Sequence, residues 1–373
     1  MRVKSKIVGS ILALVMGLAV CELMCAAVFT ICKARFSFHE PAEYIVSQEQ
    51  LAQVAPEYSS ALGWQPLYKT TFGERPGSAN SQQALITTFG DSYTHGDEVQ
   101  DSETWQTYLE PLVGGAVLNF GVGGYGTDQA LLRYRELGTR GEAKTVILGV
   151  MLENINRIVN CYRPFYFTKT GIPLTKPRFE LIDGTLSLIP NAIQSSDELK
   201  RLLSLKVMPE LGAKDYWYEH SIYPEFGFPF LRLMFSRTIW LEAIAAVRGR
   251  NRSDVDARPT VDLWQDERSR KLMLAIFDEF VADAQRLGQT PIVLLFPRKS
   301  DLEMCFNGKS EKGEQVIVDY ARRQGLKLFD GIEHLCGLSN QANYQELYAA
   351  QGHLSSKGNR ELAKGLSEFL KRG

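Results

Sequence analysis

The chain has 373 residues, of which 45% are hydrophobic and 23% are charged, and its formal net charge at pH 7 is −1. This composition is that of a globular protein, and the length allows one large α/β domain with insertions or two smaller domains. No long basic run occurs away from the N-terminus. The chain therefore gives no electrostatic basis for binding nucleic acid, and that class of function is excluded.

The N-terminus predicts a membrane segment. An apolar run extends from Ile7 to Cys32, is interrupted by one charge at Glu22, and has basic residues on both sides. The run exceeds the roughly 20 residues that a helix needs to cross a bilayer. We predict a single-pass signal-anchor over residues 1–33, with a cytoplasmic N-terminus and the remaining chain in the periplasm or outside the cell. A cleaved signal peptide is the alternative, because small residues at 25–27 offer a cleavage site.

Three of the six cysteines lie outside the apolar segment. In an oxidising compartment Cys305 and Cys336 could pair, although buried free thiols are an equally good interpretation. No spacing in the sequence resembles a zinc site, so we assign no metal and no cofactor.

The remainder of the chain divides into a stem at 34–81 and a domain at 82–373. Within the domain, strand and helix patterns alternate, which predicts an α/β class with a doubly wound parallel sheet between helical layers. An aromatic-rich and proline-rich region at about 152–261 interrupts the pattern, and we interpret it as a helical and loop insertion that covers the active face. The predicted strands are 84–89, 116–120, 144–151, 290–297 and 326–329, and the predicted helices are 104–112, 128–137, 262–286, 314–324 and 356–371.

Four loops carry residues suited to acyl transfer. Ser92 ends a Gly-Asp-Ser turn after the first strand, a glycine-rich loop at 119–129 follows the second, and Asn154 and Asn156 follow the third. His353 stands just before the last helix. The carboxyl ends of parallel strands meet at one edge of a sheet, so these loops can bring together a hydroxyl nucleophile, an imidazole base and N–H donors for an oxyanion.

These blocks resemble those of the SGNH hydrolases, also called GDSL-like esterases and lipases, over roughly residues 84–151 and 290–370. The resemblance implies a three-layer α/β/α fold with Ser92 as nucleophile and His353 as its base. It also implies an oxyanion hole made by the N–H groups of Ser92 and Gly124 and by the amide of Asn154, for which Asn156 is the reserve.

Two further residues support these loops. Asp91 is expected to cap and orient the turn that carries Ser92 rather than to take part in the chemistry. Asn119 opens the second block, Asn-x-Gly-x-x-Gly, of the same family resemblance.

The fourth block departs from the family pattern Asp-x-x-His, because Ala350 stands three residues before His353. Loss of the orienting acid costs about 10⁴ in rate in serine triads. Three interpretations follow: a Ser–His dyad held by a backbone carbonyl, a site that only binds, or an acid supplied from elsewhere, for which the candidates are Asp330, Glu333 and Glu346.

Several of these residues are also compatible with other roles. Ser92 alone is compatible with a plain turn, and the glycine-rich loop with nucleotide binding, although its spacing is not that of a phosphate-binding motif. Arg157 and Arg163 could bind an anionic or sugar substrate or form surface salt bridges.

The sequence as a whole predicts an exported, membrane-anchored serine esterase. Its substrate would be an acylated carbohydrate or cell-envelope polymer, from which it removes O-acyl groups, with acetyl as the first choice. An O-acyltransferase that modifies a polysaccharide with the same serine and histidine is the nearest alternative. A catalytically degenerate glycan-binding or assembly protein is the third hypothesis.

Overall fold

The computed structural model of the protein describes residues 2–36, 38, 41–77, 83–168, 170–220, 224–247 and 262–372. Parts of the predicted stem and insertion lie outside the described residues. At the centre is a five-stranded parallel sheet with the order β4-β3-β5-β8-β9, which confirms the predicted α/β class. Its strands are β3 (Ile86–Phe89), β4 (Val117–Asn119), β5 (Thr145–Val150), β8 (Thr290–Leu295) and β9 (Lys327–Asp330).

The strand order places a topological switch point at β3 and β5. The chain leaves β3 toward β4 on one side, and then returns to form β5 on the other side of β3. In open α/β sheets, ligands bind at such a point, outside the carboxyl ends of the strands. The loops after β3 and β5 therefore meet where a site is expected.

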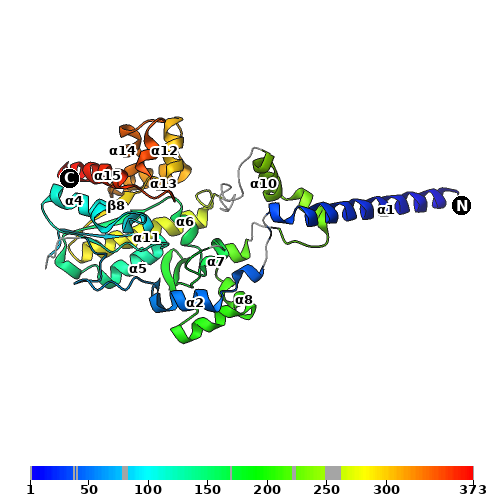
Figure 1. The fold of residues 1–373 in the computed structure, drawn as a ribbon, viewed down its shortest axis with the longest axis horizontal. Coiled ribbons are helices and arrows are strands. Elements are labelled where there is room, and N and C mark those ends of the chain that lie inside the picture. The colour runs from blue at the N-terminus through cyan, green and yellow to red at the C-terminus, as the bar shows by residue number, and fades with distance from the viewer. Residues whose placement is uncertain are drawn as a thin grey trace.

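Helices cover both faces of the sheet (Figure 1). The helices α4 (Trp105–Val113) and α15 (Ser356–Arg372) pack together on one face, and α5 (Thr127–Leu137) and α11 (Glu267–Arg286) pack together on the other. In α11 the buried residues recur at helical spacing, since Leu272, Met273, Ile276 and Phe280 face the core. The helix begins later than the predicted residue 262 because Asp266 caps it by accepting a bond from the N–H of Ser269.

The strand β5 explains why the sheet could be predicted. Its side chains from Val146 onward are buried on both faces, as is usual for a central parallel strand, and its sequence is correspondingly a continuous apolar run.

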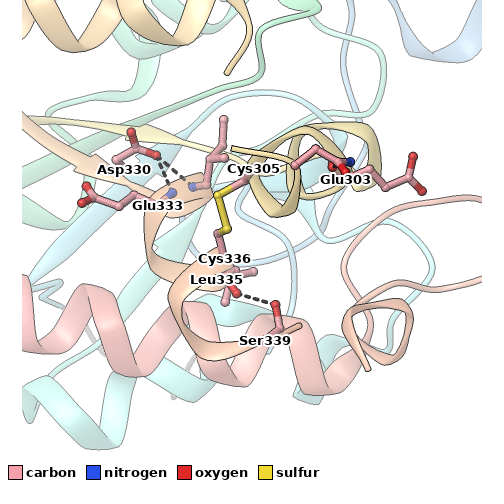
Figure 2. The surroundings of a disulfide bond; sticks show 9 residues. Glu303, Cys305, Asp330, Glu333, Leu335, Cys336 and Ser339 are labelled. Atoms are coloured by element: carbon pink, nitrogen blue, oxygen red, sulfur yellow. Dashed lines mark hydrogen bonds between the residues drawn. A yellow bond between two sulfur atoms is a disulfide. The ribbon is translucent and has the colours of Figure 1, made fainter. Parts of the chain in front are cut away.

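Two short helices after β8 and β9 were not predicted. They are α12 (Lys299–Phe306) and α14 (Gly331–Leu338), and a disulfide between Cys305 and Cys336 joins them (Figure 2). The structure thus pairs the two cysteines instead of leaving them as free thiols. Asp330 caps α14 by accepting bonds from the N–H groups of the second and third residues of that helix.

The described part of the stem packs onto the domain. It contains α2 (Gln48–Val54) and a two-stranded ribbon of β1 (Tyr58–Ser59) and β2 (Gly63–Trp64). Trp64 belongs to the main core, and its indole N–H donates to the carbonyl of Gly123 at 3.0 Å. The stem therefore contacts the glycine-rich loop of the second block.

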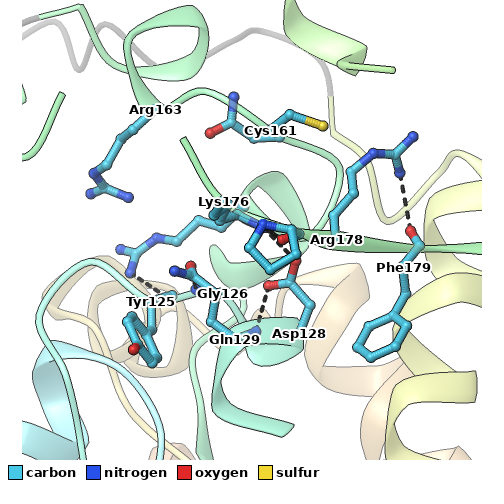
Figure 3. Close-up of polar contacts among 12 residues, drawn as sticks. Tyr125, Gly126, Asp128, Gln129, Cys161, Arg163, Lys176, Arg178 and Phe179 are labelled. Atoms are coloured by element: carbon cyan, nitrogen blue, oxygen red, sulfur yellow. Dashed lines mark hydrogen bonds and ion pairs between the residues drawn. The ribbon is translucent and has the colours of Figure 1, made fainter. Parts of the chain in front are cut away.

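The insertion contains an antiparallel hairpin of β6 (Arg178–Ile182) and β7 (Thr185–Ile189), where only helices and loops were predicted. Its turn is Asp183-Gly184, both with positive φ, which is a recognisable hairpin signal. A buried ion pair between Lys176 and Asp128 ties the insertion to the first turn of α5 (Figure 3).

The N-terminal helix α1 (Arg2–Ile31) projects away from the sheet (Figure 1). Within the described part of the chain it is the one helix long and apolar enough to cross a membrane, over Gly9–Ile31. A membrane anchor and a signal sequence both have this character.

Candidate active site

Ser92 lies at the tip of the turn that follows β3. The turn requires glycine at position 90, because a Cβ there would lie 2.1 Å from Thr94 Oγ1 and 2.7 Å from the carbonyl oxygen of Gly149. Asp91 then caps α3 (Ser92–His95), with Oδ1 accepting a bond of 2.9 Å from the N–H of Tyr93. This cap, which the sequence predicted for Asp91, holds Ser92 at the first position of the helix.

Ser92 and His353 line the same cavity. The cavity has a volume of about 780 Å³, and residues from four separate parts of the domain form it. The described residues that line it are Ser92, Tyr93, Met151, Glu153, Arg157, Arg163, Tyr166, Phe167, Arg298, Lys299, Ser300, Glu303, Gln351, Gly352 and His353.

A carboxylate holds His353. The ring Nδ1 lies 2.8 Å from Glu98 Oε2, which also accepts a bond of 3.0 Å from the N–H of His353. The other carboxylate oxygen accepts a bond of 2.6 Å from the N–H of Gln351. The ring centroid lies 5.2 Å from that of Tyr93, whose hydroxyl donates to the carbonyl of Gly352. The imidazole is therefore fixed on one side by an acid and on another by the residue after Ser92.

Glu98 supplies the acid that the fourth block lacks. Of the three interpretations, the geometry fits an acid from elsewhere in the chain, but none of the candidates named for it. Asp330 caps α14, and Glu346 pairs with Lys357 at 2.6 Å. Glu333 is a residue of α14 whose N–H donates to that cap. No spacing rule in the sequence pointed to Glu98, because its contact with His353 spans 255 positions.

The hydrogen bonds to Glu98 keep it ionised. Burial opposes ionisation, but the N–H groups of Gln351 and His353 and the imidazole of His353 together hold the pKa of the Glu98 carboxyl below its usual value. Its backbone has φ 70°, in the left-handed region that few non-glycine residues adopt. A strained residue in contact with a cavity-lining histidine is typical of a functional site.

His95, although close to Ser92 in sequence, is occupied elsewhere. Its Nδ1 lies 2.5 Å from Asp97 Oδ1, and its Nε2 lies 2.6 Å from the hydroxyl of Tyr68 in the stem. Both ring nitrogens thus have partners, and among the described histidines it is His353 that lines the cavity with Ser92.

The second block joins the glycine-rich loop to α3. Asn119 Oδ1 accepts from the N–H of Gly121, and its Nδ2 donates to the carbonyl of His95, both at 3.0 Å. Gly124 has φ 80°, and its carbonyl accepts a bond of 2.8 Å from Arg163 Nη1. Gly124 is not among the described residues that line the cavity.

Asn154 supports the turn of Ser92. It is buried, its Oδ1 accepts from the N–H of Met151, and its Nδ2 donates to Asp91 Oδ2, both at 2.8 Å. An amide nitrogen carries two hydrogens, so one remains for another acceptor. Neither Asn154 nor Asn156 is among the described residues that line the cavity, and the carbonyl of Asn156 accepts a bond of 2.8 Å from the indole of Trp217.

Arg157 is a buried residue of the site and not part of a surface salt bridge. It pairs with Glu153, donates to the carbonyl of Tyr125 at 2.9 Å, and lies 3.6 Å from Asp91 Oδ2. Burial opposes its charge, but the carboxylates of Glu153 and Asp91 raise the pKa of Arg157. Burial likewise raises the pKa of Asp91, and Arg157 counteracts this effect. The pair stabilises the turn that presents Ser92.

Arg163 is a half-buried cation whose hydrogen bonds go to neutral partners. It begins α7 (Arg163–Tyr166), and Figure 3 shows its side chain extending toward the segment of Tyr125. Nε donates to Thr170 Oγ1 at 3.1 Å, and Nη1 donates to the carbonyl of Gly124. Burial and the nearby Arg157 lower the pKa of Arg163 to about 10, so it remains charged at neutral pH. Its charge is therefore available to a ligand in the cavity.

No family model and no curated protein matches the chain. The solved structures similar to it include a member of the lipolytic protein G-D-S-L family from Veillonella parvula, with 13% identity, coverage of 77% of this chain and 98% of the other, and a TM-score of 0.38. A psychrotrophic esterase from a Pseudoalteromonas species has 10% identity, coverage of 77% and 96%, and a TM-score of 0.35. A catalytic mutant of an acetylxylan esterase from Geobacillus stearothermophilus has 11% identity, coverage of 78% and 95%, and a TM-score of 0.38.

Proposed function

We propose that the protein is a serine esterase of SGNH type, with Ser92 as nucleophile, His353 as general base and Glu98 as the acid that orients the base. The observation that carries the proposal is the bond between Glu98 Oε2 and His353 Nδ1 at the edge of a cavity that Ser92 also lines. A carboxylate on Nδ1 fixes the proton on that nitrogen, and Nε2 is then free to accept the proton of the serine.

The reaction follows from these roles. Ser92 Oγ attacks the ester carbonyl carbon while its proton passes to His353 Nε2, which delivers it to the departing alcohol oxygen. Water then attacks the acyl-enzyme, with His353 as base, and the carboxylic acid leaves as Ser92 regains its proton. We assign the oxyanion to the N–H groups of Ser92 and Gly124 and to the second amide hydrogen of Asn154.

The charges of the cavity favour a polar, partly anionic substrate. Arg163 donates to two neutral oxygens, Thr170 Oγ1 and the carbonyl of Gly124, and Lys299 is a further cation of the cavity wall. An O-acylated carbohydrate or envelope polymer bearing acidic groups fits this lining, and acetyl is the acyl group that we propose. The disulfide supports an extracytoplasmic location for the domain, because disulfides persist in oxidising compartments.

The test is labelling by a fluorophosphonate probe, which reacts with activated serines. We expect the wild type to be labelled, and Ser92→Ala and His353→Ala to remain unlabelled while keeping the wild-type unfolding midpoint. A wild type that resists labelling would contradict the esterase and favour the glycan-binding hypothesis.

A transferase would use the same residues, with a sugar hydroxyl in place of water. Release of acetate from an acetylated polysaccharide without an added acceptor supports the hydrolase. Acetate transfer that occurs only when an unmodified polysaccharide is supplied supports the transferase instead.

A further inference from the structure

A second, smaller core lies outside the main domain and includes part of α1. It joins α1 to two segments of the insertion, η8 (Phe230–Phe235) and α10 (Arg237–Val247). Figure 1 shows α10 close to the C-terminal end of α1 and away from the sheet. The buried members of this core are Phe29, Phe38, Leu233 and Ile239.

The one acidic residue in the apolar run fixes η8 against α1. The carboxylate of Glu22 accepts hydrogen bonds from the backbone N–H groups of Phe230 and Leu231, the latter at 2.8 Å. A carboxylate inside a membrane helix is costly unless it is paired, and two N–H donors provide that pairing. The segment η8 therefore lies at the level of Glu22 along α1.

That level is close to the outer surface of a bilayer. A helix rises about 1.5 Å per residue, so Glu22 lies about 24 Å from Lys6 along α1. With Lys6 at the cytoplasmic boundary of a hydrocarbon layer about 30 Å thick, Glu22 lies about 6 Å inside the opposite boundary. The small core would then sit at the boundary between acyl chains and headgroups.

The segments at this level expose large apolar side chains. Phe235 is 84% exposed, Val247 is 89% exposed and Trp240 is 51% exposed. Ile244 is also exposed on the same helix as Trp240. Exposed apolar side chains gathered next to a membrane-spanning helix mark a membrane contact, and tryptophan is enriched at the bilayer boundary.

We propose that residues 224–247 form a second membrane contact, in which η8 and α10 lie in the outer boundary of the bilayer beside α1. The apolar side chains of α10 enter the acyl region, as in interfacial helices. This contact rests on the membrane anchoring by α1 that the sequence predicts, and it brings part of the insertion to the lipid surface.

The distribution of tryptophans makes the contact measurable. Trp240 is exposed, whereas Trp64, Trp105, Trp217 and Trp264 are all buried in the main core. The full chain is placed in phosphatidylcholine nanodiscs whose lipids carry bromine near the headgroup end of the acyl chains, and in matched unbrominated nanodiscs. Bromine quenches indole fluorescence on contact, so only a tryptophan in the lipid loses emission.

The emission of Trp240 is measured as the difference between the wild type and Trp240→Phe. We expect this difference to be present in the unbrominated nanodiscs and largely lost in the brominated ones. The emission removed by the control Trp217→Phe should be equal in both kinds of nanodisc. If the chain enters nanodiscs but Trp240 is not quenched, the membrane contact of α10 is overturned, while the anchoring by α1 still holds. A protein partner that covers α10 would give this result. A chain that fails to enter nanodiscs would overturn both, while fluorophosphonate labelling tests the esterase independently.

Discussion

Replacing Glu98 by glutamine keeps the shape of the side chain but removes its charge and one of its acceptors. Glu98 Oε2 accepts from Nδ1 and the N–H of His353, and Oε1 accepts from the N–H of Gln351. A glutamine presents one oxygen and one NH₂ group, so at least one of these three donors faces another donor. With the amide oxygen toward His353 the ring keeps its tautomer but loses the negative charge that stabilises the imidazolium, and with the NH₂ group toward His353 the ring is driven to the other tautomer.

The size of the effect follows from the role of the acid. Loss of the orienting carboxylate in serine triads costs about 10⁴ in kcat, equal to about 5.5 kcal/mol in the barrier. We expect Glu98→Gln to lower kcat for an aryl acetate by about 10²- to 10⁴-fold, since glutamine keeps part of the hydrogen bonding. KM should change little, because Glu98 is not among the described residues that line the cavity.

Glu346→Gln is the matched control. Glu346 is also a glutamate of the C-terminal region, but it pairs with Lys357 on the surface, and exposed ion pairs contribute only about 0–1 kcal/mol. Its activity should equal that of the wild type. If Glu98→Gln is as active as Glu346→Gln while Ser92→Ala is inactive, the bond between Glu98 and His353 has no catalytic role, and a dyad held in another way becomes the better explanation.

Three further predictions concern stability. Gly121→Ala would place a Cβ 2.3 Å from a backbone nitrogen of α3, so it should lower the free energy of unfolding by about 1–3 kcal/mol and slow probe labelling. In the control Gly337→Ala the added Cβ meets nothing within 4 Å, so neither stability nor labelling should fall. Replacing Cys305 and Cys336 by serine opens a crosslink between residues 31 apart and should lower the free energy of unfolding by about 3–4 kcal/mol. Burial and surrounding carboxylates raise the pKa of Glu314 to about 7 in the folded state. Between the ordinary pKa of a glutamate and pH 7, the folded state therefore binds more protons than the unfolded state, and the free energy of unfolding falls as the pH rises through that window. Glu314→Gln should therefore stabilise by about 1–2 kcal/mol at pH 8, after allowance for its partial exposure, and by less at pH 5.

Urea unfolding measures all three effects. Equal midpoints for Gly121→Ala and Gly337→Ala would contradict the close approach of the glycine loop to α3. An unchanged midpoint after removal of the two cysteines would mean that they are unpaired in the folded protein. A Glu314→Gln effect that is the same at pH 5 and pH 8 would show that the carboxyl is not perturbed.

The parallel sheet could be predicted because burial on both faces leaves a direct mark on the sequence. Each predicted strand of the sheet coincides with an observed strand to within two residues at either end, and β5 is a continuous apolar run. The turn of Ser92 was also predictable, since a glycine followed by a capping Asp91 is a local signal. By contrast, α12 and α14 are short, and the hairpin in the insertion was missed although its Asp183-Gly184 turn is a recognisable signal.

The sequence by itself determined the class of fold, the nucleophile and base proposed for the site, and the apolar N-terminal segment, because periodicity and local turn chemistry are properties of neighbouring residues. Only the tertiary structure decided that Glu98 holds His353, that Asn154 supports Asp91, and that Glu22 binds a segment 208 positions away. These contacts join residues whose distance along the chain carries no signal. They depend on where the sheet and the insertion bring separate loops together, which a hydrophobic pattern does not encode.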